Sequence, residues 1–299
     1  SGGTQTYGGG LTTTSVGGTV TLNGTIASSD DAITFNAFTL GSATTIDTNA
    51  TTNTADITFT SITGGSNNLT LSTGNNIAGA DITASGNISG VTTLTLDNVG
   101  GTATLSGDVD VTTFTAGDRV TNIIFSGNGS SVTNNVDLNN DGTLTLGTSG
   151  GTQTFNGGLR TTNIDGTITL NGTITTSNDA VVLGAVTLGS ATTIDTNATS
   201  TTGDITVAAI TGGSQNLTLS TGDNIAGADI TASGAISGLG NLILADVGGT
   251  ATFSNNVAVA ALTAANTVAN ITFTGSTNTF SAAPTLANDG TLTFGDATG

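Results

Sequence analysis

The sequence predicts an all-β fold, a right-handed parallel β-helix of about 12–15 coils. Three observations predict it: a long internal repeat, short segments in which apolar residues alternate with Thr, and clusters of Gly, Asn, Ser and Asp between those segments. The composition agrees, because strong helix formers are scarce. The 299 residues include 45 Gly but one Pro, and there is no Lys, Glu, Met or Cys.

The repeat is ungapped and has a period of 148 residues. Residues 64–90, GGSNNLTLSTGNNIAGADITASGNISG, return at 212–238 as GGSQNLTLSTGDNIAGADITASGAISG. We therefore divide the chain into a first repeat at 1–148 and a second at 149–296. Residues 297–299 are expected to start a further unit, so that both repeats belong to one continuous rod.

The expected strands of the first repeat alternate apolar and polar positions, with a period of two that indicates one buried face. In chain order they lie at 19–22, 33–35, 56–59, 69–71, 94–96, 123–125 and 144–146. Several recur roughly 24 residues apart, within the range of solenoid coils.

Stacking such coils places Ile, Leu, Val and Phe inside and Thr outside. Phe35, Phe59 and Phe125 are expected in the core. The alternative fold is a tandem pair of β-sandwich domains. A 148-residue unit suits that fold too, but sandwiches rarely lack Trp, Pro and charged residues to this extent.

The acidic charge balance disfavours two classes of binding partner. The formal net charge is −18, and the only basic residues are Arg119 and Arg160. Nucleic acids and anionic membranes are disfavoured as partners, because binding them requires Lys and Arg. No apolar run is long enough to span a membrane as a helix.

Three segments carry a resemblance: GTVTLNGTI at 18–26, NLTLSTGNNI at 68–77 and ITASGNISG at 82–90. Their texture resembles the large β-strand-repeat surface proteins of bacteria, including filamentous-haemagglutinin-like exoproteins and autotransporter passenger domains. The resemblance implies a secreted, elongated β-helix used in adhesion or surface structure. The N-terminal secretion domain and C-terminal membrane barrel of that family are not in this sequence, which leaves the export route open.

Catalysis is disfavoured by the residue inventory. General acid–base chemistry has only Asp to draw on, since His, Cys, Lys and Glu are missing. The close carboxylate pairs are Asp30–Asp31 and Asp108/Asp110, and the second repeat replaces them by Asn178–Asp179 and by Asn256/Ala258. We therefore expect no enzymatic activity and no organic cofactor.

One segment has the spacing of a calcium loop. Asp137, Asn139 and Asp141 stand at alternate positions, followed by Gly142 at the sixth position. The twelfth position is Thr148, where such loops carry Glu. The second repeat reads TLANDG there. Asp137, Asn139 and Asp141 are thus a candidate Ca²⁺ site.

Two recurring residue types each allow two interpretations. Five Asp recur in both repeats: Asp31/Asp179, Asp47/Asp195, Asp56/Asp204, Asp81/Asp229 and Asp141/Asp289. We favour capping of turns by Asp side chains over bridging of rods by divalent cations. Thr-x-Thr motifs suggest ice binding, but they are scattered, and alternating Thr also follows from β propensity.

The sequence therefore predicts a non-catalytic structural protein, secreted or at the cell surface. It is expected to self-associate head to tail or laterally into an extracellular rod or filament, or to belong to a longer array. The alternatives are an adhesin stalk or a carbohydrate-binding module with surface polysaccharide as its partner. An ice-binding protein and a polysaccharide-cleaving β-helix enzyme are further alternatives.

Overall fold

The computed structural model describes residues 2–222 and 224–295, which wind about 14 turns of parallel β-solenoid. No residue of these two ranges is helical, so no helix that could span a membrane occurs in them. The predicted parallel β-helix is confirmed, and the tandem β-sandwich is wrong, because strands pair in parallel with the next turn. Residues 297–299, expected to start a further unit, lie outside the described residues.

The chain forms two compact units. Unit 1 comprises Ser1–Leu146 and Asn163–Gly166, and unit 2 comprises Gly147–Thr162 and Thr167–Gly299.

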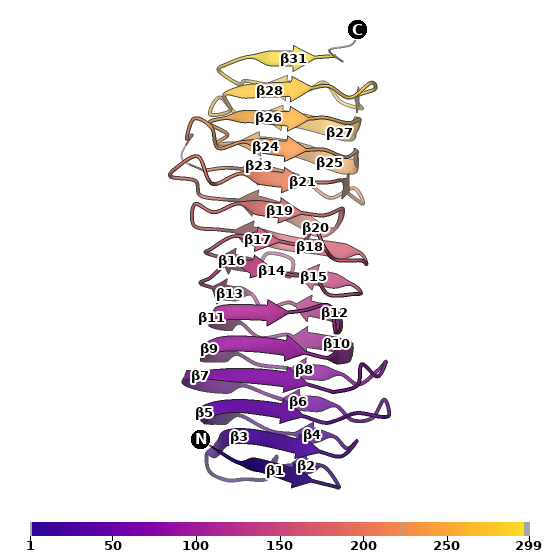
Figure 1. Cartoon of the computed structure of the whole chain (residues 1–299). Helices are drawn as coiled ribbons and strands as arrows, with labels where there is room; N and C mark the ends of the chain where they lie inside the picture. The colour runs from indigo at the N-terminus through magenta and orange to yellow at the C-terminus, as the bar shows by residue number, and fades with distance from the viewer. Residues whose placement is uncertain (1, 223, 296–299) are drawn as a thin grey trace. The chain divides into compact units, whose positions relative to one another are not determined.

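Unit 1 contains two stacks of parallel strands, labelled in Figure 1. The first stack consists of β1 (Thr4–Tyr7), β3 (Val20–Ser28), β5 (Phe38–Asp47), β7 (Ile62–Ser72), β9 (Ile88–Asp97), β11 (Val109–Ala116) and β13 (Gly129–Val132). The second consists of β2 (Leu11–Thr12), β4 (Ile33–Thr34), β6 (Ile57–Phe59), β8 (Ile82–Ala84), β10 (Val99–Leu105), β12 (Val120–Phe125) and β15 (Leu144–Leu146). The short β14 (Val136–Asp137) completes unit 1.

Unit 2 repeats this arrangement. One stack consists of β16 (Thr152–Phe155), β18 (Ile168–Thr175), β20 (Val186–Asp195), β22 (Ile210–Thr211) with β23 (Leu217–Ser220), β25 (Ile236–Ala245), β27 (Val257–Ala264), and β29 (Thr279–Phe280) with β30 (Thr285–Leu286). The other consists of β17 (Leu159–Arg160), β19 (Val181–Leu183), β21 (Ile205–Val207), β24 (Ile230–Ala232), β26 (Thr250–Phe253), β28 (Asn270–Phe273) and β31 (Leu292–Phe294).

The core of each unit is a set of apolar columns that cross the turns. Phe35, Phe59 and Phe125 are at most 1% exposed, as predicted. One column of unit 1 stacks residues that are all fully buried: Ile33, Ile57, Ile82, Ala103, Ile123 and Leu144. Each side chain therefore packs on its equivalent one turn away, as in other solenoids.

The turns use the residues that tolerate a left-handed backbone. Asn49 and Asn98 have φ of 46° and 53°, and their second-repeat equivalents Asn197 and Asp246 have φ of 44° and 49°. Asn and Asp adopt this conformation at low cost. The 148-residue repeat of the sequence is thus also a repeat of backbone geometry.

Some strands are longer than the sequence indicates. GGS at 64–66 reads as a turn before a strand, but it lies inside β7, whose pairing with β9 shifts register between Thr63 and Asn67. Gly65 and Ser66 have φ of 57° and 62° there. The three residues form a bulge that bends a continuous strand.

Candidate functional site

The three residues of the candidate calcium loop lie on the surface of unit 1. Asp137 is the last residue of β14, and Asn139 and Asp141 precede β15. All three are exposed. Across residues 2–222 and 224–295, no three His, Cys, Asp or Glu side chains form a group that could hold a metal ion. Calcium binding by Asp137, Asn139 and Asp141 stays a prediction.

The residue that anchors this loop is its buried neighbour Asn140. Its Nδ2 donates to the carbonyl oxygens of Thr121 (3.0 Å) and Thr143 (3.1 Å). Asn288 of unit 2 makes the equivalent bond to the carbonyl of Ala269 (3.3 Å). The shared NDG sequence therefore has a structural role that does not depend on a metal ion.

Of the pair Asp30–Asp31, Asp30 acts as a clamp for a loop. Its carboxylate accepts hydrogen bonds from the backbone N–H groups of Thr51 (2.6 Å) and Thr52 (2.7 Å), and from both hydroxyls. These bonds, the Thr51 hydroxyl's first, lower the pKa of Asp30 below the ordinary 3.8. Asn178 binds the equivalent loop of unit 2 through its Oδ1, so the clamp does not require a charge.

Three of the five recurring Asp pairs accept hydrogen bonds from backbone N–H groups. Asp56 Oδ1 accepts from the N–H of Asp81 (2.9 Å), and Asp81 Oδ1 accepts from the N–H of Thr102 (2.7 Å) one turn further on. The same chain of bonds joins Asp204, Asp229 and Thr250. Asp47 and Asp195 each accept the N–H of the Asn two residues later. Turn capping is confirmed for Asp47/Asp195, whereas Asp56/Asp204 and Asp81/Asp229 bind backbone N–H groups of the neighbouring coil.

Outward Thr residues form columns that the sequence did not reveal. Thr34, Thr58, Thr83 and Thr104 pair in register on four successive turns of unit 1. On the next turn Thr104 pairs with Ile124, so the column covers four turns and does not extend along the whole unit. Ice binding stays a prediction.

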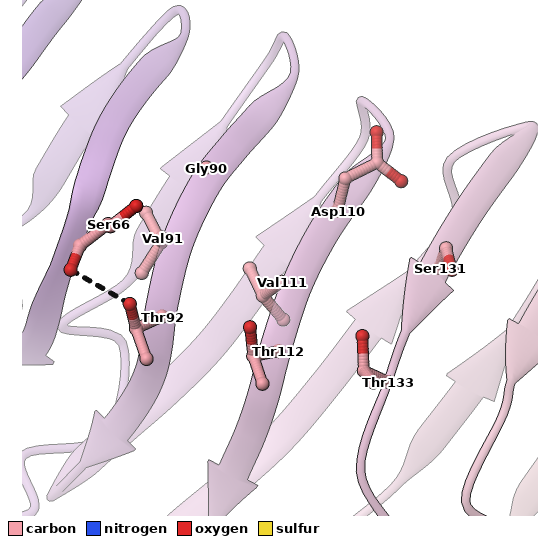
Figure 2. A pocket seen from close by; sticks show the side chains of 9 residues that line it. All are labelled: Ser66, Gly90, Val91, Thr92, Asp110, Val111, Thr112, Ser131 and Thr133. Atoms are coloured by element: carbon pink, nitrogen blue, oxygen red, sulfur yellow. Dashed lines mark hydrogen bonds between the residues drawn. The ribbon is translucent and has the colours of Figure 1, made fainter.

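A shallow groove crosses the first stack of unit 1 (Figure 2). Its volume is about 270 Å³. We call it groove 1, and its lining consists of Ser66, Gly90, Val91, Thr92, Asp110, Val111, Thr112, Ser131 and Thr133. In Figure 2, Thr92, Thr112 and Thr133 form a row across three turns, and Asp110 lies to one side of this row, on the same strand as Thr112. Thr92 Oγ1 donates to the carbonyl of Ser66 (2.9 Å).

Unit 2 has a groove at the equivalent place, with a volume of about 280 Å³. We call it groove 2, and its lining consists of Ser214, Gly238, Leu239, Ala258, Val259, Ala260, Thr279 and Ser281. Each of these positions is 148 residues after a position that lines groove 1. The groove is thus part of the repeated architecture.

Asp110 is the one charged side chain that lines groove 1. Partial withdrawal from water, and then the charge of Asp108, raise the pKa of Asp110, while the backbone N–H of Ser131 opposes the shift. Asp108 itself is held by the backbone N–H of Gly129, 2.8 Å from its Oδ1. The pair Asp108/Asp110 therefore brings one carboxylate into a groove and uses the other to fix a turn.

Sequence reasoning missed the groove and found only Asp110 among its lining residues. The signal was present, because Gly within an alternating strand pattern indicates a bulge. Gly90, with φ of 66°, lies inside β9, where the register with β7 shifts between Ser89 and Val91. Two wider hollows, one lined by Thr173 and Thr193 and one by Thr19 and Thr39, contain no charged residue.

No protein-family model, curated protein or solved structure matches this chain. The architecture itself is that of β-helix repeat proteins.

Proposed function

We propose that this chain is a non-catalytic structural protein, secreted or displayed at the cell surface, that stacks end to end with further solenoid turns. Those turns belong either to another copy or to a longer array. The finer assignment to filamentous-haemagglutinin-like or autotransporter-like proteins is part of this proposal and rests on the repeat texture.

The observation that carries the proposal is an open stack of aromatic rings in unit 2. Phe253 and Phe273 stack with centroids 4.9 Å apart, and Phe273 and Phe294 stack at 5.1 Å with an interplanar angle of 8°. Phe273 is fully buried, whereas Phe294 is 53% exposed. One more strand with an apolar side chain would cover the last ring and continue the column.

The backbone beside that ring is also open to a partner. Among the described residues, β31 pairs with one strand, β28. Leu292 of β31 is 40% exposed, although it belongs to a column that is buried at Ile271 and Ile230. Strand edges of this kind are templates for pairing with another strand.

β1 in unit 1 has the same character. It pairs with β3, and all four of its residues are exposed, including Tyr7. Because the end that carries β1 and the end that carries β31 are different surfaces, a contact between them is heterologous and adds copies in one direction without closing. Repetition of this contact gives a filament.

Sedimentation of the purified chain over a range of concentrations tests the proposal. We expect the wild type to form a concentration-dependent series of oligomers, and the double variant Leu292→Asp/Phe294→Asp to remain monomeric. Thr206→Asp on a wall of unit 2 is the matched control and should assemble like the wild type. A wild type that stays monomeric at every concentration, or a double variant that still assembles, would contradict end-to-end stacking of separate copies.

A second candidate function, an adhesin or carbohydrate-binding surface module, is favoured by the oxygen-rich lining of groove 1.

A further inference from the structure

The two grooves share their backbone. Ser66 and Ser214 have φ of 62° and 67°, and Gly90 and Gly238 have φ of 66° and 68°. The strand pair that lines each groove shifts register at the same place. In unit 1 the shift lies between Asp110 and Val111 of β11, and in unit 2 it lies opposite the equivalent residues of β27, between Ser237 and Leu239 of β25. The solenoid therefore builds this groove whatever side chains line it.

The linings differ in chemistry. Thr92, Asp110 and Thr112 of groove 1 correspond to Gly240, Ala258 and Ala260 in unit 2. Groove 1 thus offers a carboxylate and two hydroxyls at positions where unit 2 has no side-chain oxygen. Since unit 2 forms a groove of nearly the same volume without these groups, the fold does not require them.

We propose that groove 1 binds a neutral glycan, with Asp110 as its principal anchor. The carboxylate accepts hydrogen bonds from adjacent sugar hydroxyls, and these charge-assisted bonds are the strongest that such a groove can offer. The hydroxyls of Thr112, Ser131 and Thr133 both donate and accept, as sugar hydroxyls do. Val91 and Val111, which also line the groove, are only 2% and 5% exposed, so the polar side chains provide its recognition groups.

Other ligand classes fit less well. A calcium ion takes six to eight oxygen ligands, commonly from several carboxylates, and groove 1 has one carboxylate. Anionic ligands would be repelled by the Asp110 carboxylate and by the chain's net charge of −18. A neutral polyol is attracted by the hydroxyls and is not repelled by the charge.

The repeat of the lining favours an extended glycan. Thr92, Thr112 and Thr133 lie on three successive turns (Figure 2), and neighbouring strands are about 4.8 Å apart. This spacing is close to the length of one sugar ring in an extended β-linked chain. Successive rings running across the strands would therefore meet successive Thr side chains. The volume of about 270 Å³ accommodates a short piece of such a chain.

The test uses cellotetraose and chitotetraose as probes and the amide NMR spectrum of the whole chain as the readout. In the wild type we expect millimolar binding that shifts the amides of groove 1 and leaves those of groove 2 unchanged. Asp110→Ala/Thr112→Ala, which gives groove 1 the residues of groove 2, is expected to weaken binding about tenfold or more, because a charge-assisted anchor is lost. The reciprocal variant Ala258→Asp/Ala260→Thr is expected to create a second site in unit 2.

Thermal unfolding of each variant is the control for folding. We expect it to match the wild type, because each variant carries at both positions the residues of the other repeat. Three outcomes overturn the proposal: neither probe binds to the wild type, binding is unchanged in Asp110→Ala/Thr112→Ala, or the two wild-type grooves respond equally. Because these variants leave Leu292 and Phe294 intact, the result is independent of end-to-end assembly.

Discussion

Buried hydroxyl groups link successive turns inside both units. Thr48 is fully buried, and its Oγ1 donates to the carbonyls of Ala55 (2.7 Å) and Thr73 (3.3 Å). Thr196 of unit 2 makes the equivalent bonds to Gly203 and Thr221. A buried carbonyl without a donor is costly, so a single Thr at this position satisfies a loop carbonyl that has no strand partner.

Replacing Thr48 by Val keeps the shape of the side chain and removes the donor. We expect Thr48→Val to lower the free energy of unfolding by about 1–3 kcal/mol, because the carbonyl of Ala55 is left unsatisfied. Urea unfolding of the variant measures this change. The control is Thr58→Val on the outer wall, which should stay within about 0.5 kcal/mol of the wild type. Equal stability of the two variants would show that the buried hydroxyl contributes nothing specific.

The clamp at Asp30 makes a pH-dependent contribution to stability. Its pKa is lowered in the folded protein, so the stabilisation is fully present above the unfolded value of 3.8 and is lost as pH falls through the folded pKa. We expect Asp30→Ala to lower the thermal midpoint at neutral pH. Asp30→Asn should keep most of the midpoint, because Asn178 accepts the equivalent backbone hydrogen bonds in unit 2, and lose this part of the acid sensitivity. A titration of the Asp30 carboxyl that gave a pKa at or above 3.8 would contradict the clamp.

At the scale of strands and turns, close backbone approach decides where Gly is required. A Cβ on Gly100 would lie 2.3 Å from the backbone nitrogen of Ile77, and one on Gly248 would lie 2.3 Å from that of Ile225. Real Cβ contacts are never so short, so the neighbouring turn would have to move. These two positions are equivalent in the repeat, which indicates that the stacking distance imposes the same residue twice.

We therefore expect Gly100→Ala to destabilise unit 1 by about 1–3 kcal/mol through overpacking. Gly117→Ala is the control, since a Cβ there meets nothing within 4 Å and Ala265 stands at the equivalent position. Chemical denaturation of both variants measures the change in the free energy of unfolding. If Gly100→Ala unfolded at the wild-type midpoint, the turns would be less tightly stacked than described.

The period-two pattern and the 148-residue repeat were sufficient to predict parallel stacking and the buried Phe residues. They could not predict that β7 continues through Gly64–Ser66, because Gly and Ser between strands usually mark turns. Pairing with the next turn holds this segment as a bulge instead. Groove 1 depends on that bulge, so its position became visible only in three dimensions. Asn140 was missed for a similar reason, since its neighbours Asn139 and Asp141 fit a ligand pattern and it does not.

At the scale of the whole molecule, the repeat has two consequences. Each turn needs to match only its neighbours, so a block of turns can be duplicated without redesign. The duplicated block also retains features whose chemistry then diverges, as in the change from Asp110 to Ala258. A structural role and a binding role are compatible in such a chain, because the turns carry the stacking and the outer lining is free to vary.

Electron microscopy of the purified, concentrated chain tests end-to-end stacking most directly. The account predicts unbranched filaments in which density repeats at the strand spacing of about 4.8 Å, and in which the end of one copy that carries β31 stacks on the end of the next copy that carries β1. Leu292→Asp/Phe294→Asp should abolish these filaments. Separate particles of single-chain size at every concentration, or filaments joined along their side walls, would contradict it.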